Sequence, residues 1–284
     1  MKKHAGIDVQ EMYPAGSPPK ADNWTFDTFL KAAEACFKGG NPFGIGLGTT
    51  SDNVDTAGTI FRSFGAELVN AKGELTVKSD PVRQALDYYK KLMAFLPPDV
   101  AAWDDASNNK FLVSGQASMI MNPPSAWAVA KRDAPKVAEQ LWTHGSPAGP
   151  KGRFAPFVPY FWSIWNFSKN QAAAKSLIVH LSQRAVVEKM VEASNGYDLP
   201  SFANFTDFKT WAEEGPPKGT LYHYPNINNH QILSIAGAPA PHKIGEQIYV
   251  QALQTQMAVR YFRGEAMEKT LDWAANELEG FTRN

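Results

Sequence analysis

One stretch decides the fold: Trp103-Asp-Asp-Ala-Ser-Asn-Asn-Lys-Phe-Leu-Val-Ser-Gly-Gln-Ala-Ser-Met-Ile-Met-Asn-Pro-Pro-Ser-Ala-Trp127. Ser107 is expected to cap a short helix that Gly115 ends. The apolar run 117–121 is typical of a strand buried in a parallel sheet. Asn122-Pro-Pro-Ser125 stops this strand at its carboxyl end, and a second helix follows. The order predicts one compact βα unit.

Polar and aromatic residues gather where this strand ends. Ligands of open α/β sheets bind beyond the carboxyl ends of the strands. Asn122 and Ser125 offer amide and hydroxyl groups for ligand hydroxyls, and the Trp127 indole could cover the C–H face of a sugar. A packed core indole is the alternative for each tryptophan, and it is favoured for Trp127. The pattern therefore predicts a sugar-binding rim.

A second polar segment, 49–55, directly follows a glycine-interleaved strand over residues 43–48. Its glycine spacing does not match the dinucleotide fingerprint, and close backbone packing beside a cleft explains these glycines better. Asn53 and Asp55 are explained equally well as ligand-hydroxyl partners or as part of a solvated loop and helix cap. With the residues around other predicted strand ends, the binding candidates are Asn53, Asp55, Trp103, Asp104, Asn122, Ser125, Trp127, Tyr160 and Trp162.

Composition narrows the range of possible functions. The 284 residues are 44% hydrophobic and 20% charged, as is ordinary for a globular chain with a sizeable core. Lys+Arg and Asp+Glu both number 28, so no net field attracts nucleic acid, and no nucleic-acid partner is expected. The single cysteine, Cys36, excludes an internal disulfide and a thiolate cluster, and a buried inert thiol is expected. No apolar run is long enough for a membrane span.

Catalysis and metal binding are not favoured. The paired carboxylates at Asp104-Asp105 and Glu213-Glu214 are adjacent, whereas glycoside hydrolysis needs two that oppose each other across the substrate. The six histidines have no metal-ligand spacing. We therefore expect no catalytic residue, no metal and no cofactor.

Local patterns predict the remaining elements. Thr25 caps a helix that runs to Gly39-Gly40, and Asn70-Ala-Lys-Gly73 turns a small hairpin. Further elements are a helix from Asp80 to Leu96, a strand over 162–167, helices over 171–182 and to about 193, an irregular region over 201–242, one long helix over 244–262 and a last helix over 267–278.

These segments resemble the sugar-binding extracellular solute-binding proteins of bacterial ABC transporters. The shared pattern is an aromatic-acidic start, Phe111, Ser114-Gly-Gln-Ala-Ser-Met119 and an Asn-x-Pro turn. It continues, in the same order, through Pro147–Arg153, Trp162–Asn170, Ala172–Lys175, Asn195–Pro200 and Glu277–Phe281. The resemblance covers nearly all of the chain from Trp24 onward.

The resemblance implies an α/β fold of the periplasmic-binding type II, with two lobes and hinge crossings. Residues 1–162 would form most of the carboxyl-terminal lobe, 163–228 a returning segment of the amino-terminal lobe, and 229–284 the cross-back and final helices. The first part of the amino-terminal lobe would be absent. No apolar segment follows Met1-Lys-Lys, so no signal peptide is expected, although the family works in the bacterial periplasm.

The implied function is capture of a carbohydrate or polyol by hinge closure and its delivery to the permease subunits of an ABC transporter. Family equivalents of Trp103, of the residues after the Asn-x-Pro turn and of Trp162 line the cleft. Maltodextrin-binding relatives often carry a tryptophan where this chain has Ser125, which favours a smaller or more polar ligand. Apolar surface left by an absent lobe would promote self-association. The alternatives are a carbohydrate-active enzyme domain and a lone lobe without ligand function.

Overall fold

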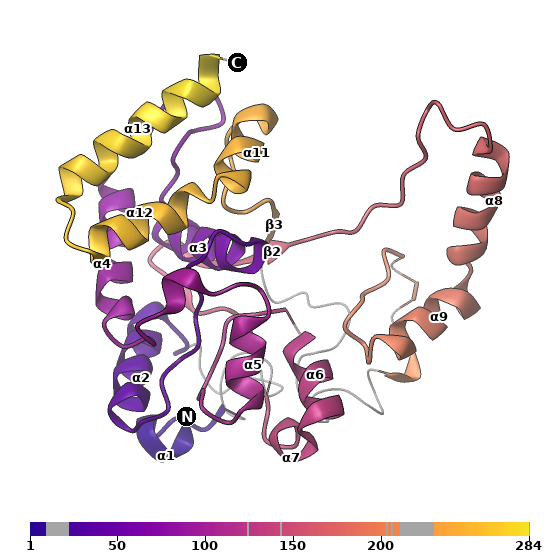
Figure 1. Ribbon diagram of the computed structural model, residues 1–284, viewed down its shortest axis with the longest axis horizontal. Coiled ribbons are helices and arrows are strands. Elements are labelled where there is room, and N and C mark those ends of the chain that lie inside the picture. The colour runs from indigo at the N-terminus through magenta and orange to yellow at the C-terminus, as the bar shows by residue number, and fades with distance from the viewer. Residues whose placement is uncertain are drawn as a thin grey trace.

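The computed structural model describes residues 1–9, 23–123, 125–142, 144–202, 204–205, 207–210 and 230–283 (Figure 1). Most elements form one helical body, and two helices lie apart from it. The helices are α1 (Lys2–Ala5), α2 (Phe26–Lys38), α3 (Ser51–Phe64), α4 (Asp80–Met93), the 3-10 helix η2 (Val100–Ala102), α5 (Ser107–Val113), α6 (Ser125–Asp133), α7 (Pro135–Ala138), α8 (Gln171–Leu181), α9 (Arg184–Ala193), α11 (His242–Val250), α12 (Leu253–Phe262) and α13 (Met267–Arg283). Among the described residues, none of these helices is both long and apolar enough to span a bilayer.

The core lies among α2, α3, α4, α12 and α13. Phe29, Phe43 and Tyr89 are fully buried there, with edge-to-face contact between the two phenylalanine rings at 5.0 Å. The predicted burial of the single thiol is confirmed, because Cys36 is also fully buried on α2. The apolar stripes predicted from the sequence therefore meet in a single core.

Helix α2 begins and ends as its sequence predicts. The Thr25 hydroxyl accepts a hydrogen bond from the Thr28 backbone N–H at 3.3 Å, and Gly39 follows the last turn. Helix α4 begins at Asp80-Pro81 as expected, but it ends at Met93, before the predicted stop at Pro97-Pro98. The hairpin is present as the bridge between Val69 and Leu75.

The sheet is small and was not predicted. It contains β1 (Ala148–Gly149), β2 (Gly152–Phe157) and β3 (His230–Leu233), in that order. Strand β1 is antiparallel to β2, and β2 is parallel to β3, in a register that places Phe154 opposite His230. Strand β2 packs against α3 and leads towards α8, while β3 leads into α11 (Figure 1).

Two predicted strands, 43–48 and 117–121, are extended segments rather than strands. They meet at the single parallel bridge between Gly44 and Ile120, supported by the Gly44 N–H donating to the Met119 carbonyl at 2.8 Å. The segment 117–121 therefore pairs in parallel at one point, but no ladder extends this pairing. The predicted strand 162–167 is wrong, because these residues form an extended connection and a turn. Trp103 follows η2 and not a strand.

The long helix predicted over 244–262 is wrong, because it is two helices. Ala252 has φ 50°, in the left-handed region, and this residue separates α11 from α12. The kink lets Ala252 lie buried beside Val54 and Ala236. Packing at this point overrides the continuous helical pattern of the sequence.

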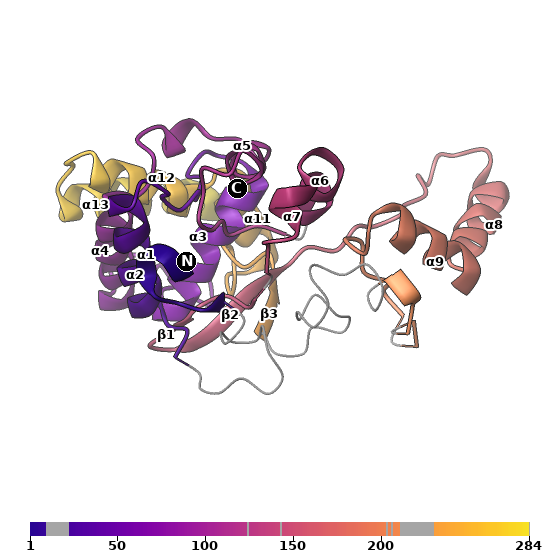
Figure 2. The same cartoon turned by 90° about the horizontal axis from the view of Figure 1, so that it is seen from below.

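Helices α8 and α9 lie away from the body at the end of a long connection from β2, and both views show the separation (Figures 1 and 2). They have a small apolar cluster of their own, formed by Val191, Phe205 and Phe208. Arg184 of α9 lies over the last two of these rings at 5.5 and 5.0 Å. No side chain of α8 is buried.

Candidate ligand-binding site

The glycines of the segment 43–48 allow three other elements to approach it. A Cβ on Gly44 would lie 2.8 Å from the Phe111 ring, and one on Gly46 would lie 2.9 Å from Cγ of Asn53. A Cβ on Gly48 would overlap the Trp103 carbonyl oxygen. This confirms that the glycines serve close packing.

Asn53 and Trp103 lie together, and both are turned into the protein. The Asn53 amide donates to the Trp103 carbonyl at 2.9 Å and to the Thr50 hydroxyl at 3.0 Å. The Trp103 indole packs edge-to-face on Phe111 at 5.2 Å within the main core. These two candidates hold the start of α3 against the segment that follows η2.

The adjacent carboxylates Asp104 and Asp105 each cap a different helix. Asp104 accepts hydrogen bonds from the Ser107 hydroxyl at 2.6 Å and from the Ala106 N–H at 3.1 Å, and the first of these lowers the pKa of Asp104. The sequence predicted Ser107 as the residue that caps the helix. In the structure Ser107 is instead the first residue of α5, and its hydroxyl donates to the Asp104 carboxylate that precedes the helix.

Asp105 performs the same task at the start of α3. Its two oxygens accept from the Ser51 hydroxyl at 2.9 Å and from the Asp52 N–H at 3.1 Å. The helix N-terminus favours this negative charge. The Asp104-Asp105 pair is therefore accounted for by two helix caps.

Two aspartates of α3, Asp52 and Asp55, and Tyr249 of α11 form a group of titratable side chains near this cap. Asp55 is buried, and its Oδ2 accepts from the Tyr249 hydroxyl of α11 at 3.2 Å, whereas its Oδ1 has no partner among the described residues. Burial raises the pKa of Asp55 to about 7, and the charges of Asp52 and Asp105 raise it as well. Burial and the charge of Asp105 raise the pKa of Asp52 to about 6. Asp52 lies one helical turn before Asp55, so both carboxyl groups lie near the same face of α3.

Asn122 and Ser125 belong to a hydrogen-bond network between α5 and α6. The Asn122 amide donates to Asn109 Oδ1 at 2.9 Å and to the Ser125 hydroxyl at 3.1 Å. Its oxygen accepts from Asn108 at 2.7 Å. Asn122 and Ser125 are half-buried, so the network occupies their polar atoms while part of their surface stays accessible.

The remaining candidates differ in exposure. Trp127 is buried in a small cluster with Ala130 and Ala138, below the ammonium group of Lys131 at 5.3 Å. Tyr160 and Trp162 are exposed on the connection between β2 and α8. The Tyr160 and Tyr197 hydroxyls are 3.4 Å apart.

Tyr197 links this connection to the acids of α3. Burial and the Tyr160 hydroxyl raise the pKa of Tyr197, and the charge of Asp52 contributes to the increase. Tyr197 therefore lies within electrostatic reach of Asp52 at the start of α3. The structure places Tyr160 beside Tyr197, and it places Trp127 and Asn122 in separate clusters.

Sequence reasoning missed three residues of this arrangement, Asp52, Tyr197 and Tyr249. The helical spacing from Asp55 could have indicated Asp52. Tyr197 lies in the segment Asn195–Pro200, which was noted only for its resemblance. Nothing local in the sequence connects Tyr249 to Asp55, since 194 residues separate the two.

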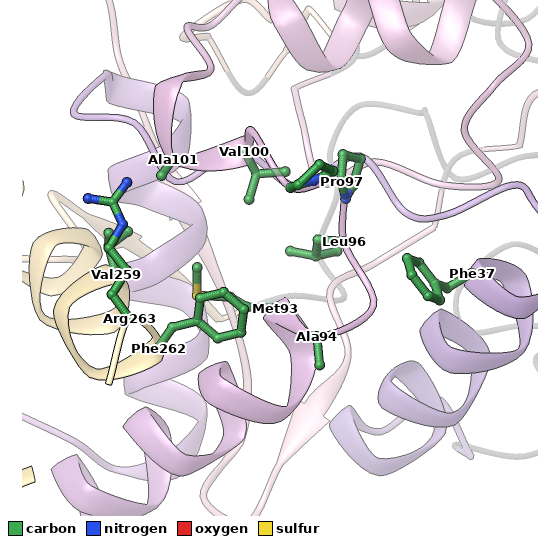
Figure 3. Close-up of a pocket in the computed structure, with 11 residues that line it drawn as sticks. Phe37, Met93, Ala94, Leu96, Pro97, Val100, Ala101, Val259, Phe262 and Arg263 are labelled. Carbon is green, nitrogen blue, oxygen red and sulfur yellow. The ribbon is translucent and has the colours of Figure 1, made fainter. Parts of the chain in front are cut away.

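The site carries amide, hydroxyl and carboxyl groups that can bind ligand hydroxyls. Within the described ranges, no group of three or more His, Cys, Asp or Glu is placed to hold a metal ion. Glu213-Glu214 lies outside the described residues. Two hollows of about 410 and 370 Å³ lie elsewhere, beside α12, and neither is lined by a predicted binding residue (Figure 3).

Comparison with known protein families matches residues 3–187 to the family described as bacterial extracellular solute-binding protein. Comparison with curated proteins gives no match. Among solved structures, the chain is similar to maltose-bound MalE3 of T. maritima, with a TM-score of 0.73 and 18% identity over 93% of this chain and 66% of that one.

Two further structures have the same fold. A sugar transporter protein from Arthrobacter chlorophenolicus A6 with bound laminaribiose has a TM-score of 0.72 and 14% identity, over 92% of this chain and 65% of that one. A solute-binding protein from Thermotoga lettingae TMO bound with α-D-tagatose has a TM-score of 0.67 and 17% identity, over 98% and 67%. The chain thus spans about two thirds of the length of these structures. The likeness confirms the predicted α/β fold class.

Proposed function

Because the chain belongs to the bacterial extracellular solute-binding proteins, we propose that it binds a carbohydrate or polyol for delivery to the permease of an ABC transporter. Three structures that share its fold hold maltose, laminaribiose and α-D-tagatose. The corresponding location is the bacterial periplasm or cell exterior. The family binds solutes, and the proposed role includes no chemical step.

One observation carries the proposed site: Tyr197, the partner of the exposed Tyr160 on the connection from β2, lies within electrostatic reach of Asp52 at the start of α3. Tyr160 and Trp162 are 72% and 58% exposed, and the charge of Asp52 reaches Tyr197, the partner of Tyr160. Rings that stack on sugar C–H faces and carboxylates that accept from sugar hydroxyls are the two components of a carbohydrate site. We assign Tyr160 and Trp162 to stacking and the half-buried Asp52 to hydroxyl binding, with the buried Asp55 supporting Asp52 from one helical turn further along α3.

The other candidates take supporting or peripheral roles in this proposal. Asn53, Trp103 and Trp127 are buried, so they hold the scaffold. Asp104 is exposed, and Asn122 and Ser125 are half-buried, so each keeps accessible atoms for the rim of the site. Their hydrogen bonds to neighbouring helices would fix these atoms in place before the ligand arrives.

The domain boundaries stay a proposal of the same kind. Residues 1–162 would form the carboxyl-terminal lobe, 163–228 a segment of the other lobe, and 229–284 the return. The separation of α8 and α9 from the body in Figure 1 supports a boundary after β2. Bending at the connections beside β2 and β3 would close the rings onto the acids.

Thermal unfolding with a panel of sugars and polyols tests this function. A ligand that binds only the folded chain raises the melting temperature in a dose-dependent manner. Maltose, laminaribiose, tagatose and mannitol span the relevant sizes. Trp162→Ala and Tyr160→Ala should each weaken the affinity for the ligand about two- to tenfold, since each removes a stacking ring.

Phe167→Ala is the matched control, because this ring is equally exposed on the same connection but stacks on Trp165 at 5.3 Å. It should leave the response unchanged. No rise with any sugar or polyol, or equal losses in all three variants, would contradict the proposed site.

We also propose that the chain associates with itself through this connection. Tyr160, Phe161, Trp162, Trp165 and Phe167 are 58–79% exposed. At roughly 200 Å² for each fully exposed ring they present about 700 Å², close to the ~800 Å² that each partner buries in a standard interface. Light scattering should find a concentration-dependent dimer or larger species, which Phe161→Ser with Trp165→Ser should dissociate. A monomer at all concentrations would refute the association.

A further inference from the structure

A groove runs along α12, outside the proposed sugar site. Its two hollows, of about 410 and 370 Å³, share the lining residues Ala101, Val259 and Arg263, so they adjoin. Figure 3 shows the first hollow. Their volumes are in the range of small-molecule sites. We call these adjoining hollows the α4–α12 groove.

The two ends of the α4–α12 groove differ in chemistry. Helices α2, α4 and α12 and the loop after α4 make the first end apolar, with walls formed by Phe37, Met93, Leu96, Pro97, Pro98 and Phe262. Phe37 and Phe262 are 43% and 39% exposed, so both rings offer accessible apolar surface at this end. Thr49, Gln256 and Arg260 line the second end, which is polar.

Arg263 lies where the two ends of the groove meet, and its positive charge has no ion-pair partner among the described residues. It has no ion pair and no side-chain hydrogen bond within the described ranges, unlike Arg260, which pairs with Glu265 at 3.2 Å and covers the Trp273 ring at 4.0 Å. No acidic side chain is among the residues that line either hollow. The groove therefore combines apolar walls with one available cation.

We propose that the α4–α12 groove binds an amphiphilic carboxylate, with its apolar chain against Phe37 and Phe262 and its carboxylate on Arg263. A carbohydrate does not fit the first end, because proline, leucine and phenylalanine walls offer no partners for its hydroxyls. A small inorganic anion would leave the apolar end unused. A planar guanidinium binds a carboxylate through two parallel hydrogen bonds, which gives the head group a specific position.

Isothermal titration of the full chain with three eight-carbon probes tests the proposal. Octanoate, octanol and octylammonium have the same tail and differ only in the head group. Octanoate should saturate one site and bind at least fivefold more tightly than octanol, with octylammonium weakest. Arg263→Gln should abolish the preference for octanoate over octanol, whereas Arg132→Gln, on an exposed arginine of α6, should preserve it.

The tail is tested separately by Phe262→Ser, a change at an exposed position. This variant should weaken octanoate and octanol alike. Octanoate that does not saturate, a preference that survives Arg263→Gln, or affinity unaffected by Phe262→Ser would each overturn the proposal. The last result would place the tail on another surface, such as the rings of residues 160–167.

Discussion

Asp55 should make the chain less stable as the pH rises, and Asp55→Asn should remove this loss. The carboxyl group is 6% exposed, and one of its oxygens has no partner among the described residues. Burial raises its pKa from 3.8 to about 7. Three neighbours face it: Asp52 on α3 and Asp105 before α5 raise the pKa by their charge, and the Tyr249 hydroxyl of α11 lowers it by donating a hydrogen bond.

The direction of this change in stability follows from the protonation of Asp55 in the folded and in the unfolded chain. Below pH 3.8 the group is protonated whether the chain is folded or unfolded, so Asp55 has no effect on the free energy of unfolding. Between pH 3.8 and about 7 the unfolded chain releases the proton that the folded chain retains, so stability falls. The full difference between these two pKa values corresponds to a loss of about 4 kcal/mol in the free energy of unfolding. Because Asp52 titrates nearby, we expect a cost of about 2–4 kcal/mol above pH 7.

Asparagine preserves the shape of this side chain and can still accept from Tyr249, but it carries no charge. Urea unfolding of both proteins at pH 5, 6, 7 and 8 should show Asp55→Asn to be the more stable, by a margin that widens with pH. Asp87→Asn is the matched control, since Asp87 accepts from Tyr261 at 2.8 Å in an exposed position. A constant margin across this pH range would refute the assigned burial cost.

Three further variants test the packing. Gly58→Ala should destabilise the chain by about 1–3 kcal/mol in urea, despite better helix propensity, because its Cβ would lie 2.7 Å from the Ala236 backbone nitrogen; a stabilised variant would contradict this contact. Asn122→Ala should cost about 1–3 kcal/mol by leaving Asn108 and Asn109 without their partner, and an unchanged melting temperature would exclude the network. His144 packs on Trp24 at 5.2 Å, and burial lowers its pKa from 6.5 to about 4, so stability should fall as the pH drops through this range. His144→Gln should remove that acid sensitivity, and an equally acid-sensitive variant would refute it.

Helices were predictable because their signals are local. The cap of α2 at Thr25, its end at Gly39 and the proline-led start of α4 each depend on a few consecutive residues. The break at Ala252 was not predictable, since the 244–262 pattern is continuously helical and only the packing beside Val54 shows why the helix kinks.

Strands were predicted less well because pairing depends on distant residues. The run 117–121 has the composition of a buried strand, but its one bridge joins Ile120 to Gly44, and no ladder develops. Strands β2 and β3 pair across more than seventy residues, and their sequences contain proline, glycine and histidine, which conceal the strand pattern.

The site shows why polar residues at element ends are ambiguous. Asp104, Asn122 and Asn53 were selected because they follow predicted strands, where ligands bind, but helix starts lie at the same positions and have unsatisfied N–H groups. In this chain, helix starts and the turns between elements use the polar atoms of these side chains, through hydrogen bonds of 2.6 to 2.9 Å.

Solvent exposure distinguishes a ligand-binding role from a structural role where the residue type does not. Tyr160 and Trp162 are aromatic, so burial would be their default position, and yet they lie on the surface of the connection from β2. Asp55 is the converse, an acid inside the protein with one oxygen lacking a partner in the described chain. Exposed rings cost stability in the absence of a ligand, and a sugar stacked on them would reduce that cost because it covers the rings. A hydroxyl of the same sugar would donate to the half-buried Asp52, whereas Asp55 stays a buried supporting group. The proposed function therefore accounts for the exposed rings.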